Sequence, residues 1–190
     1  NCGDVMQDAA LFYVNKAKHP DFLLPEHFIL ATLHRAENTD SPERLQSIIA
    51  ALEEIAREMP VVIPIHPRTR KKLQELNFNF KQTRLQLVDP VGYLEMVYLL
   101  KHCSFVATDS GGLQKEAYFF KKYCITLRTE TEWIELVEQG ANIITGWKYE
   151  DILNSYKQLK HTTKDVFSSP LYGDGQAGHI IIRELQRIDS

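Results

Sequence analysis

The sequence Val106-Ala-Thr-Asp-Ser-Gly-Gly-Leu-Gln-Lys-Glu-Ala117 decides the fold, because an apolar run enters a Ser-Gly-Gly turn that opens a helix. The first N–H groups of a helix have no partner within it, and glycine lets the backbone approach a ligand closely. With the positive end of the helix dipole and the Ser110 hydroxyl, these groups suit a phosphate or diphosphate. The same residues also suit an ordinary strand-to-helix turn with an N-cap, and the local pattern alone does not separate the two interpretations.

On both sides of this turn, short apolar runs alternate with amphipathic segments. The predicted strands cover residues 28–32, 61–65, 85–88, 105–108, 123–127 and 141–145. The predicted helices between and after them cover residues 42–58, 69–76, 92–101, 112–120, 131–138 and 150–160. Continuous apolar strands separated by helices indicate a parallel sheet that is covered on both faces. The predicted fold class is therefore α/β, with a doubly wound, Rossmann-like parallel sheet that binds ligands at the carboxyl ends of its strands.

The two ends of the chain lie outside this alternation. An amphipathic helix is predicted over residues 5–16, within a linker segment 1–20, and a final helix over residues 176–188. We expect residues 1–190 to form one domain, with both end helices facing a domain that this chain lacks. The first residue is Asn1 instead of Met, which favours the interpretation of a fragment.

Composition excludes several classes of protein. The chain is 44% hydrophobic and 25% charged, and its formal net charge is -3 with a pI near 6.2. This balance provides no basic field, so we expect no nucleic-acid partner. No apolar run is long enough to span a bilayer and no signal-peptide pattern is present, so we expect no membrane partner and a cytoplasmic location. The three cysteines lack metal-ligand spacing, and we expect neither a metal nor a thiol mechanism.

Polar residues follow four of the predicted strands. These stretches are Thr32-Leu-His-Arg-Ala-Glu-Asn38, His66-Pro-Arg-Thr-Arg70, Asp109-Ser-Gly-Gly112 and Arg128-Thr-Glu-Thr-Glu132. Parallel strands end at one edge of the sheet, so we expect the imidazoles, the guanidiniums and the Gly-Gly turn to converge on one polyanionic ligand. Two members have other interpretations. His66 can simply fix the strand exit before Pro67, and Glu116 can stabilise the helix N-terminus instead of binding a ribose hydroxyl.

Six motifs, in this order, resemble the C-terminal half of the non-hydrolysing UDP-N-acetylglucosamine 2-epimerases. They are Thr32-Leu-His-Arg-Ala-Glu-Asn38, Ile65-His-Pro-Arg68, Val88-Asp-Pro-Val-Gly-Tyr93, Thr108-Asp-Ser-Gly-Gly-Leu-Gln-Lys-Glu-Ala117, Leu127-Arg-Thr-Glu-Thr-Glu-Trp133 and Tyr172-Gly-Asp-Gly-Gln-Ala177. The resemblance implies the C-terminal half of a GT-B-type fold, in which two Rossmann-like domains face a cleft. It also implies UDP and a UDP-amino sugar as ligands, no cofactor, the missing N-terminal domain as a partner, and a homodimer for the full-length protein.

The resemblance also assigns roles to residues. Ser110, Gly111 and Gly112 would hold the diphosphate, Glu116 would hold the ribose hydroxyls, and the stretch that includes Met96 would border the uracil. His34 matches the functionally important histidine of the family and is the expected catalytic residue. Further substrate contacts are expected from Arg35, Glu37, His66 and Arg128, although His66 can instead belong to a regulatory site for a sugar nucleotide.

The implied reaction inverts C2 of a UDP-2-acetamido sugar. The family removes the C2 proton, expels UDP to give a 2-acetamidoglucal, and adds UDP back after protonation from the opposite face. The carboxylates that move the proton come from the N-terminal domain, so we expect this chain by itself to be inactive. Trp133-Ile134 stands where one branch of the family has Arg-Pro, and Ala36 stands where a second Arg often follows the His-Arg pair. Both departures leave the exact sugar open. The alternatives are the donor-binding domain of a GT-B glycosyltransferase and a non-catalytic nucleotide-sugar sensor.

Overall fold

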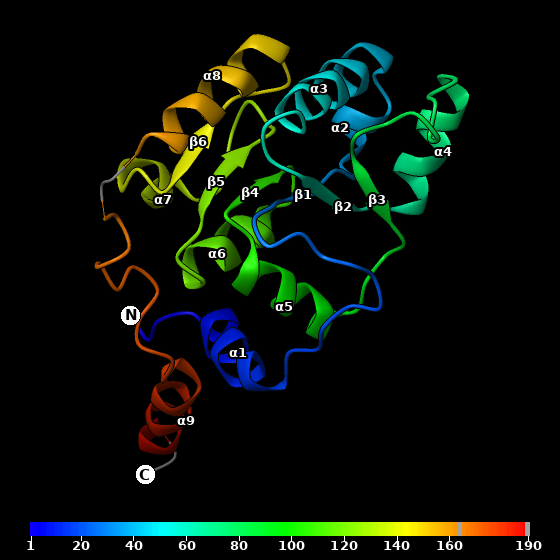
Figure 1. Ribbon diagram of the computed structural model, residues 1–190. Helices are drawn as coiled ribbons and strands as arrows, with labels where there is room; N and C mark the ends of the chain where they lie inside the picture. The colour runs from blue at the N-terminus through cyan, green and yellow to red at the C-terminus, as the bar shows by residue number, and fades with distance from the viewer. Residues whose placement is uncertain (163–164, 189–190) are drawn as a thin grey trace.

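A six-stranded parallel sheet lies between two layers of helices (Figure 1) in the computed structural model, which describes residues 1–162 and 165–188. The strand order is β3-β2-β1-β4-β5-β6, so the chain reverses its direction of winding between β1 and β4. The strands are β1 (Ile29–Thr32), β2 (Val61–Pro64), β3 (Gln86–Val88), β4 (Phe105–Thr108), β5 (Tyr123–Thr126) and β6 (Asn142–Ile144). This order confirms the predicted doubly wound α/β fold.

The helices divide between the two faces of the sheet (Figure 1). One face is covered by α3 (Pro42–Ile55), α4 (Pro67–Glu75) and α8 (Tyr149–Lys160), with the short helix α2 (Ala36–Thr39) beside α3. The other face is covered by α5 (Tyr93–His102) and α6 (Gly111–Phe119), and α1 (Val5–Tyr13) packs beneath them. The remaining helices are η1 (Val14–Lys16), α7 (Ile134–Glu138) at the β6 edge, and α9 (Ala177–Ile188), which projects from the body.

The two faces of β1 explain why its sequence is apolar throughout. Ile29 and Ala31 pack into the core under α3 and α8, whereas Phe28 and Leu30 pack into the core under α5 and α6. A strand that is buried on both faces has no solvent side, so no polar alternation is possible. On the α3 side, the predicted helical spacing is confirmed by buried residues at Leu45, Ile48, Ile49, Leu52 and Ile55.

The sequence pattern missed one element and misplaced the starts of two others. Helix α4 begins at Pro67, two residues before the predicted range, because His66 is its N-cap. Helix α2 was not predicted, because four residues are too few for an apolar periodicity. Helix α7 begins at Ile134, three residues later than the predicted range, because Thr131 Oγ1 accepts a hydrogen bond from Trp133 N at 3.1 Å and forms a local turn. The predicted strand 141–145 is shortened to Asn142–Ile144. None of the described helices is long and apolar enough to cross a membrane.

The register of the sheet sets the position of the polar segments. Thr32 pairs with Thr108, and Thr108 pairs with Thr126, so β1, β4 and β5 end at the same level. The hydroxyl oxygens of Thr32 and Thr108 are 2.6 Å apart and join two of these ends. The segments that start at residues 33, 109 and 127 therefore leave the sheet side by side, as the argument from parallel strands requires.

Candidate functional site

The Ser-Gly-Gly turn is both a helix cap and a set of free donors. Ser110 is the N-cap of α6, and its hydroxyl accepts a hydrogen bond from Leu113 N at 3.5 Å. The Ser110 N–H donates to Thr108 Oγ1 at 2.9 Å. Gly111 and Gly112 are the first two helical residues, so their N–H groups have no carbonyl partner in α6. The two interpretations of this motif from the sequence are therefore compatible with each other.

A cavity of about 300 Å³ lies on the β1 and β2 side of this turn. Its apolar walls come from the end of β2, the loop after β3, α5 and single leucines after β1 and in α6, and its polar groups come from the strand ends and α6. An apolar cavity with a few converging polar groups is typical of a small-molecule site. The lining residues are Thr32, Leu33, His34, Pro64, His66, Pro90, Val91, Met96, Ser110, Gly112, Leu113 and Glu116. Six of these were predicted site residues: His34, His66, Met96, Ser110, Gly112 and Glu116.

The two imidazoles both line the cavity, with their ring centroids 6.1 Å apart and their planes tilted by 41°. His34 Nδ1 lies 3.4 Å from Asp109 Oδ1. His66 is the N-cap of α4, and its Nδ1 accepts a hydrogen bond from Arg68 N at 3.2 Å. A ring nitrogen that accepts a backbone hydrogen bond leaves the proton on Nε2, which can then donate to a ligand. His66 thus fixes the strand exit and also lines the cavity.

Asp109 is the residue that sequence reasoning missed. Its carboxylate is fully buried and accepts hydrogen bonds from the backbone N–H groups of His34, at 3.1 Å, and Arg35, at 2.9 Å. It also accepts from Asn38 Nδ2 at 3.3 Å. These bonds hold the loop that presents His34 and leads into α2. The position of an aspartate directly after a strand was the available signal, but its partners lie more than seventy residues away.

Glu116 and Tyr93 form a hydrogen-bonded pair beside the cavity. Burial raises the pKa of Glu116, and the hydrogen bond from Tyr93 partly opposes this. Burial and the nearby Glu116 carboxyl raise the pKa of Tyr93 to about 12. Tyr93 therefore remains a hydrogen-bond donor at neutral pH, and it holds Glu116 where a ribose hydroxyl could reach the carboxylate.

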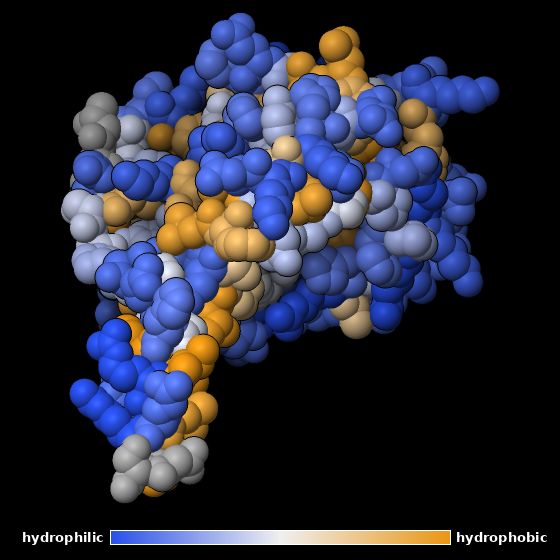
Figure 2. Space-filling view, turned by 90° about the horizontal axis from the view of Figure 1, so that it is seen from below, coloured by the Kyte–Doolittle hydropathy of each residue, from blue (hydrophilic) through white to orange (hydrophobic). Residues whose placement is uncertain are grey.

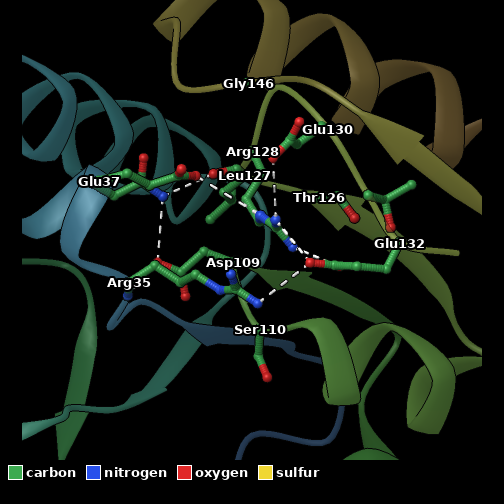
Figure 3. Close-up of polar contacts among 12 residues, drawn as sticks. Arg35, Glu37, Asp109, Ser110, Thr126, Leu127, Arg128, Glu130, Glu132 and Gly146 are labelled. Carbon is green, nitrogen blue, oxygen red and sulfur yellow. Dashed lines mark hydrogen bonds and ion pairs between the residues drawn. The ribbon is translucent and has the colours of Figure 1, made fainter.

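Arg128 occupies the other side of the turn, among carboxylates (Figure 3). Its side chain is 4% exposed, and Glu132 accepts two hydrogen bonds from it, at 2.8 and 3.0 Å. Glu37 and Glu130 complete the cluster with ion-pair distances of 3.8 and 3.9 Å. The bidentate pair raises the pKa of Arg128 and lowers the pKa of Glu132, so both side chains are charged at neutral pH.

The predicted residues therefore divide between two sides of one turn. Outside the lining of the cavity, beside the loop after β5, lie Arg35, Glu37, Gly111 and Arg128. Arg35 Nη2 lies 3.8 Å from a Glu132 carboxylate oxygen. An anion that bound Arg35 or Arg128 in this arrangement would compete with the carboxylates that already form ion pairs with these side chains. The prediction that these four residues contact a substrate stays a prediction.

The two glycines of the turn leave room for protein neighbours. A Cβ at Gly111 would lie 3.3 Å from Glu132 Oε2 and 3.4 Å from Arg35 Nη2. A Cβ at Gly112 would lie 3.6 Å from Met6 Cε of α1. The absent side chain of Gly111 thus accommodates the charged cluster. Among the described residues, no group of three His, Cys, Asp or Glu side chains could hold a metal ion.

Comparison with known proteins gives this geometry a context. A sequence model described as UDP-N-acetylglucosamine 2-epimerase matches residues 1–186. Over 99% of its length the chain is 50% identical to the UDP-2,3-diacetamido-2,3-dideoxy-D-glucuronate 2-epimerase of Pseudomonas aeruginosa, and it covers 52% of that protein. Over 86% of its length it is 39% identical to the UDP-N-acetylglucosamine 2-epimerase of Methanocaldococcus jannaschii, of which it covers 45%.

Solved structures agree with the sequence comparison. The Methanocaldococcus jannaschii UDP-GlcNAc 2-epimerase in complex with UDP-GlcNAc and UDP matches with a TM-score of 0.86 at 36% identity, over 97% of this chain and 54% of that one. The Neisseria meningitidis UDP-GlcNAc 2-epimerase bound to UDP-GlcNAc matches with a TM-score of 0.83 at 29% identity, over 97% and 54% of the two chains. The chain thus spans about half the length of these relatives.

Proposed function

Because this chain belongs to the UDP-N-acetylglucosamine 2-epimerase family, we propose that it is the UDP-binding half of an enzyme that inverts C2 of a UDP-2-acetamido sugar. The observation that supports this most is the cavity at the start of α6, where Ser110, His34, His66 and Glu116 meet. Relatives of the same fold have been solved with UDP or UDP-GlcNAc bound. The cavity volume of about 300 Å³ is at the lower end of those of small-molecule sites.

The chemistry of the lining suggests how UDP would lie. The diphosphate would accept hydrogen bonds from the Gly112 N–H, the Ser110 hydroxyl and the imidazoles, at the positive end of α6. The ribose hydroxyls would donate to Glu116. The uracil ring would then reach the apolar wall that Pro90 and Met96 form.

The proposed reaction begins when a base removes the C2 proton. The C1–O bond then breaks, its electron pair leaves with UDP, and a C1=C2 double bond forms. Negative charge develops on the departing diphosphate oxygen, and fixed N–H donors together with His34 would stabilise it. Protonation of C2 on the opposite face and attack of UDP on C1 complete the inversion. We assign the C2 base to the half of the enzyme that this chain does not supply, since the relatives are about twice as long.

The apolar face of α9 supports a second half as the partner (Figure 2). Figure 2 shows a hydrophobic stripe along α9 that continues onto the adjoining body, with hydrophilic residues on the other side of the helix. The α9 residues Ile182, Leu185 and Ile188 are 56%, 57% and 79% exposed. Asp8 of α1 accepts hydrogen bonds from Ala177 N and Gly178 N, at 3.2 and 2.7 Å, and so sets the direction of α9. We propose that α1 and α9 pack against the N-terminal domain of the complete enzyme.

Calorimetric titration of the chain with UDP tests the nucleotide site. We expect wild-type chain to bind UDP and Ser110→Ala to bind it about ten- to a hundredfold more weakly, because a hydrogen bond to a charged group contributes about 1.5–3 kcal/mol. Ser104→Ala is the matched control, since Ser104 lies at the opposite end of β4. The assignment is wrong if wild-type chain gives no binding heat, or if both variants bind UDP like the wild type.

A further inference from the structure

The turn that starts α6 is held from the side opposite the cavity. The loop between β5 and α7, residues 129–133, covers Gly111. Trp133 Nε1 donates a hydrogen bond to the Gly111 carbonyl oxygen at 2.8 Å, and Glu132 lies against the same glycine. The cavity on the other side is lined by Ser110 and Gly112. One short turn therefore has a ligand face and a face that the protein covers.

The peptide bond between Gly111 and Gly112 links these two faces. A peptide unit is planar, so its C=O and its N–H point in opposite directions and rotate together. The indole of Trp133 holds the Gly111 C=O on the covered side. It thereby fixes the direction of the Gly112 N–H, which belongs to the same plane and whose residue lines the cavity.

Trp133 is itself held by buried polar groups. Thr131 Oγ1 accepts from Trp133 N at 3.1 Å and donates to Gln114 Oε1 at 2.6 Å. The ammonium of Lys115 lies 4.1 Å from the centre of the indole system. Lys115 is 5% exposed and forms an ion pair with Asp4, which also caps α1 by accepting from Met6 N at 2.8 Å. The indole is therefore fixed from α6, from its own loop and, through Lys115, from the start of α1.

We propose that Trp133 is a positioning residue for the anion-binding turn, which aims the Gly112 N–H at the diphosphate, and that Lys115 and Asp4 hold the indole for this task. This inference rests on the proposed function for the identity of the ligand. It assigns a role to the loop 129–133 that requires no direct contact between Trp133 and the nucleotide. Because Trp133 acts on the conformation of the turn itself, its role can be measured both with and without a ligand.

The chain has two tryptophans, which allow a matched experiment. Trp133→Phe keeps an aromatic ring beneath Lys115 but removes the N–H donor, together with one ring of the indole. Trp147→Phe is the control, because Trp147 packs against the core on the α3 side and stacks with Arg44 at 5.6 Å. In titrations with UDP we expect Trp133→Phe to weaken binding about three- to tenfold, the effect of one lost hydrogen bond. Trp147→Phe should bind within about twofold of the wild type. Its remaining tryptophan emission, which comes from Trp133, should change as UDP binds.

Amide hydrogen exchange without nucleotide separates this inference from the proposed function. The first amides that bond within α6 follow Gly112, and we expect Trp133→Phe to speed their exchange about fivefold. Lys115→Met removes the charge over the indole and should also increase the exchange rate of these α6 amides. A chain that binds no UDP yet shows these changes would refute the proposed function and support the positioning role. Unchanged exchange in Trp133→Phe would overturn the inference. So would equal UDP affinities of Trp133→Phe and Trp147→Phe when the wild-type chain binds UDP.

Discussion

The carboxyl group of Glu116 couples ligand binding to stability. Burial raises its pKa above the ordinary glutamate value of 4.5. As pH rises from that value, the unfolded chain loses this proton before the folded chain does. The unfolded state then binds fewer protons, so this group lowers the free energy of unfolding as pH increases. The free energy of unfolding stops decreasing once the pH exceeds the raised pKa of Glu116 in the folded state.

We expect Glu116→Gln to be more stable than wild type at neutral pH and to lose this advantage toward acid pH. Urea unfolding at several pH values between about pH 4 and pH 8 measures the difference in the free energy of unfolding between the variant and the wild type. The same variant should bind UDP more weakly, because an amide with a single acceptor oxygen replaces the carboxyl group that would accept from the ribose hydroxyls. Glu26→Gln, in an exposed loop, controls for a general change of charge. A constant stability difference across this range would contradict the assignment to Glu116.

Single residues also show what the sequence could predict and what it could not. His34, His66, Ser110 and Glu116 line one cavity because strand ends in a parallel sheet are neighbours, which a pattern of strands and helices already implies. The pairing of Arg128 with Glu132 was not predicted. A guanidinium suits phosphate and carboxylate equally well, and the choice depends on side-chain packing, which spacing does not encode.

At the scale of elements, the first turn of α6 depends unequally on its two glycines. Neither has a positive φ, so alanine fits the backbone at both positions. We expect Gly112→Ala to stabilise the chain by about 0.5–1 kcal/mol through the reduced entropy of the unfolded state. Its Cβ would make an ordinary contact with Met6 at 3.6 Å.

Gly111→Ala should gain less or lose stability, because its Cβ would lie 3.3 Å from Glu132 and 3.4 Å from Arg35. Moving these side chains would disturb the ion pair with Arg128. We expect its free energy of unfolding to lie about 1 kcal/mol below that of Gly112→Ala. Thermal or urea unfolding of the two alanine variants measures this difference in stability. Equal stabilities would show that the side chains of Glu132 and Arg35 move aside without a cost in stability.

The helix that the sequence pattern missed is one whose flanking loop is held by a distant residue. The long helices and buried strands follow from local periodicity and caps, such as Ser41 before α3. The loop that leads into helix α2 is held by Asp109, whose carboxylate accepts hydrogen bonds from the backbone N–H groups of His34 and Arg35. No local signal indicates a carboxylate that comes from the segment after another strand, so the pattern predicts a loop there.

At the scale of the whole molecule, the exposed apolar face of α9 and the half-length match to relatives support the same proposal. A hollow of about 620 Å³ lies between α1 and α9, lined in part by Leu11, Phe12 and Ile182. Exposed apolar surface of this kind marks an interaction site in a stable protein. The N-terminal domain proposed above would both supply the C2 base and cover this helix face.

The final prediction tests that proposal directly. We expect the chain alone to bind UDP without exchanging the C2 hydrogen of a UDP-2-acetamido sugar in D₂O, measured by NMR. Fusion to the complementary half of the Pseudomonas aeruginosa relative should produce exchange, because the fusion supplies the base.

The double variant Ile182→Lys with Leu185→Lys should abolish exchange in the fusion, since a charge buried in a domain interface is costly, while UDP binding by the chain remains. Arg183→Glu with Arg187→Glu, on the polar face of α9, is the matched control and should retain activity. Exchange by the chain alone would refute the assignment of the base, and an active fusion with both lysines would exclude α9 from the domain contact.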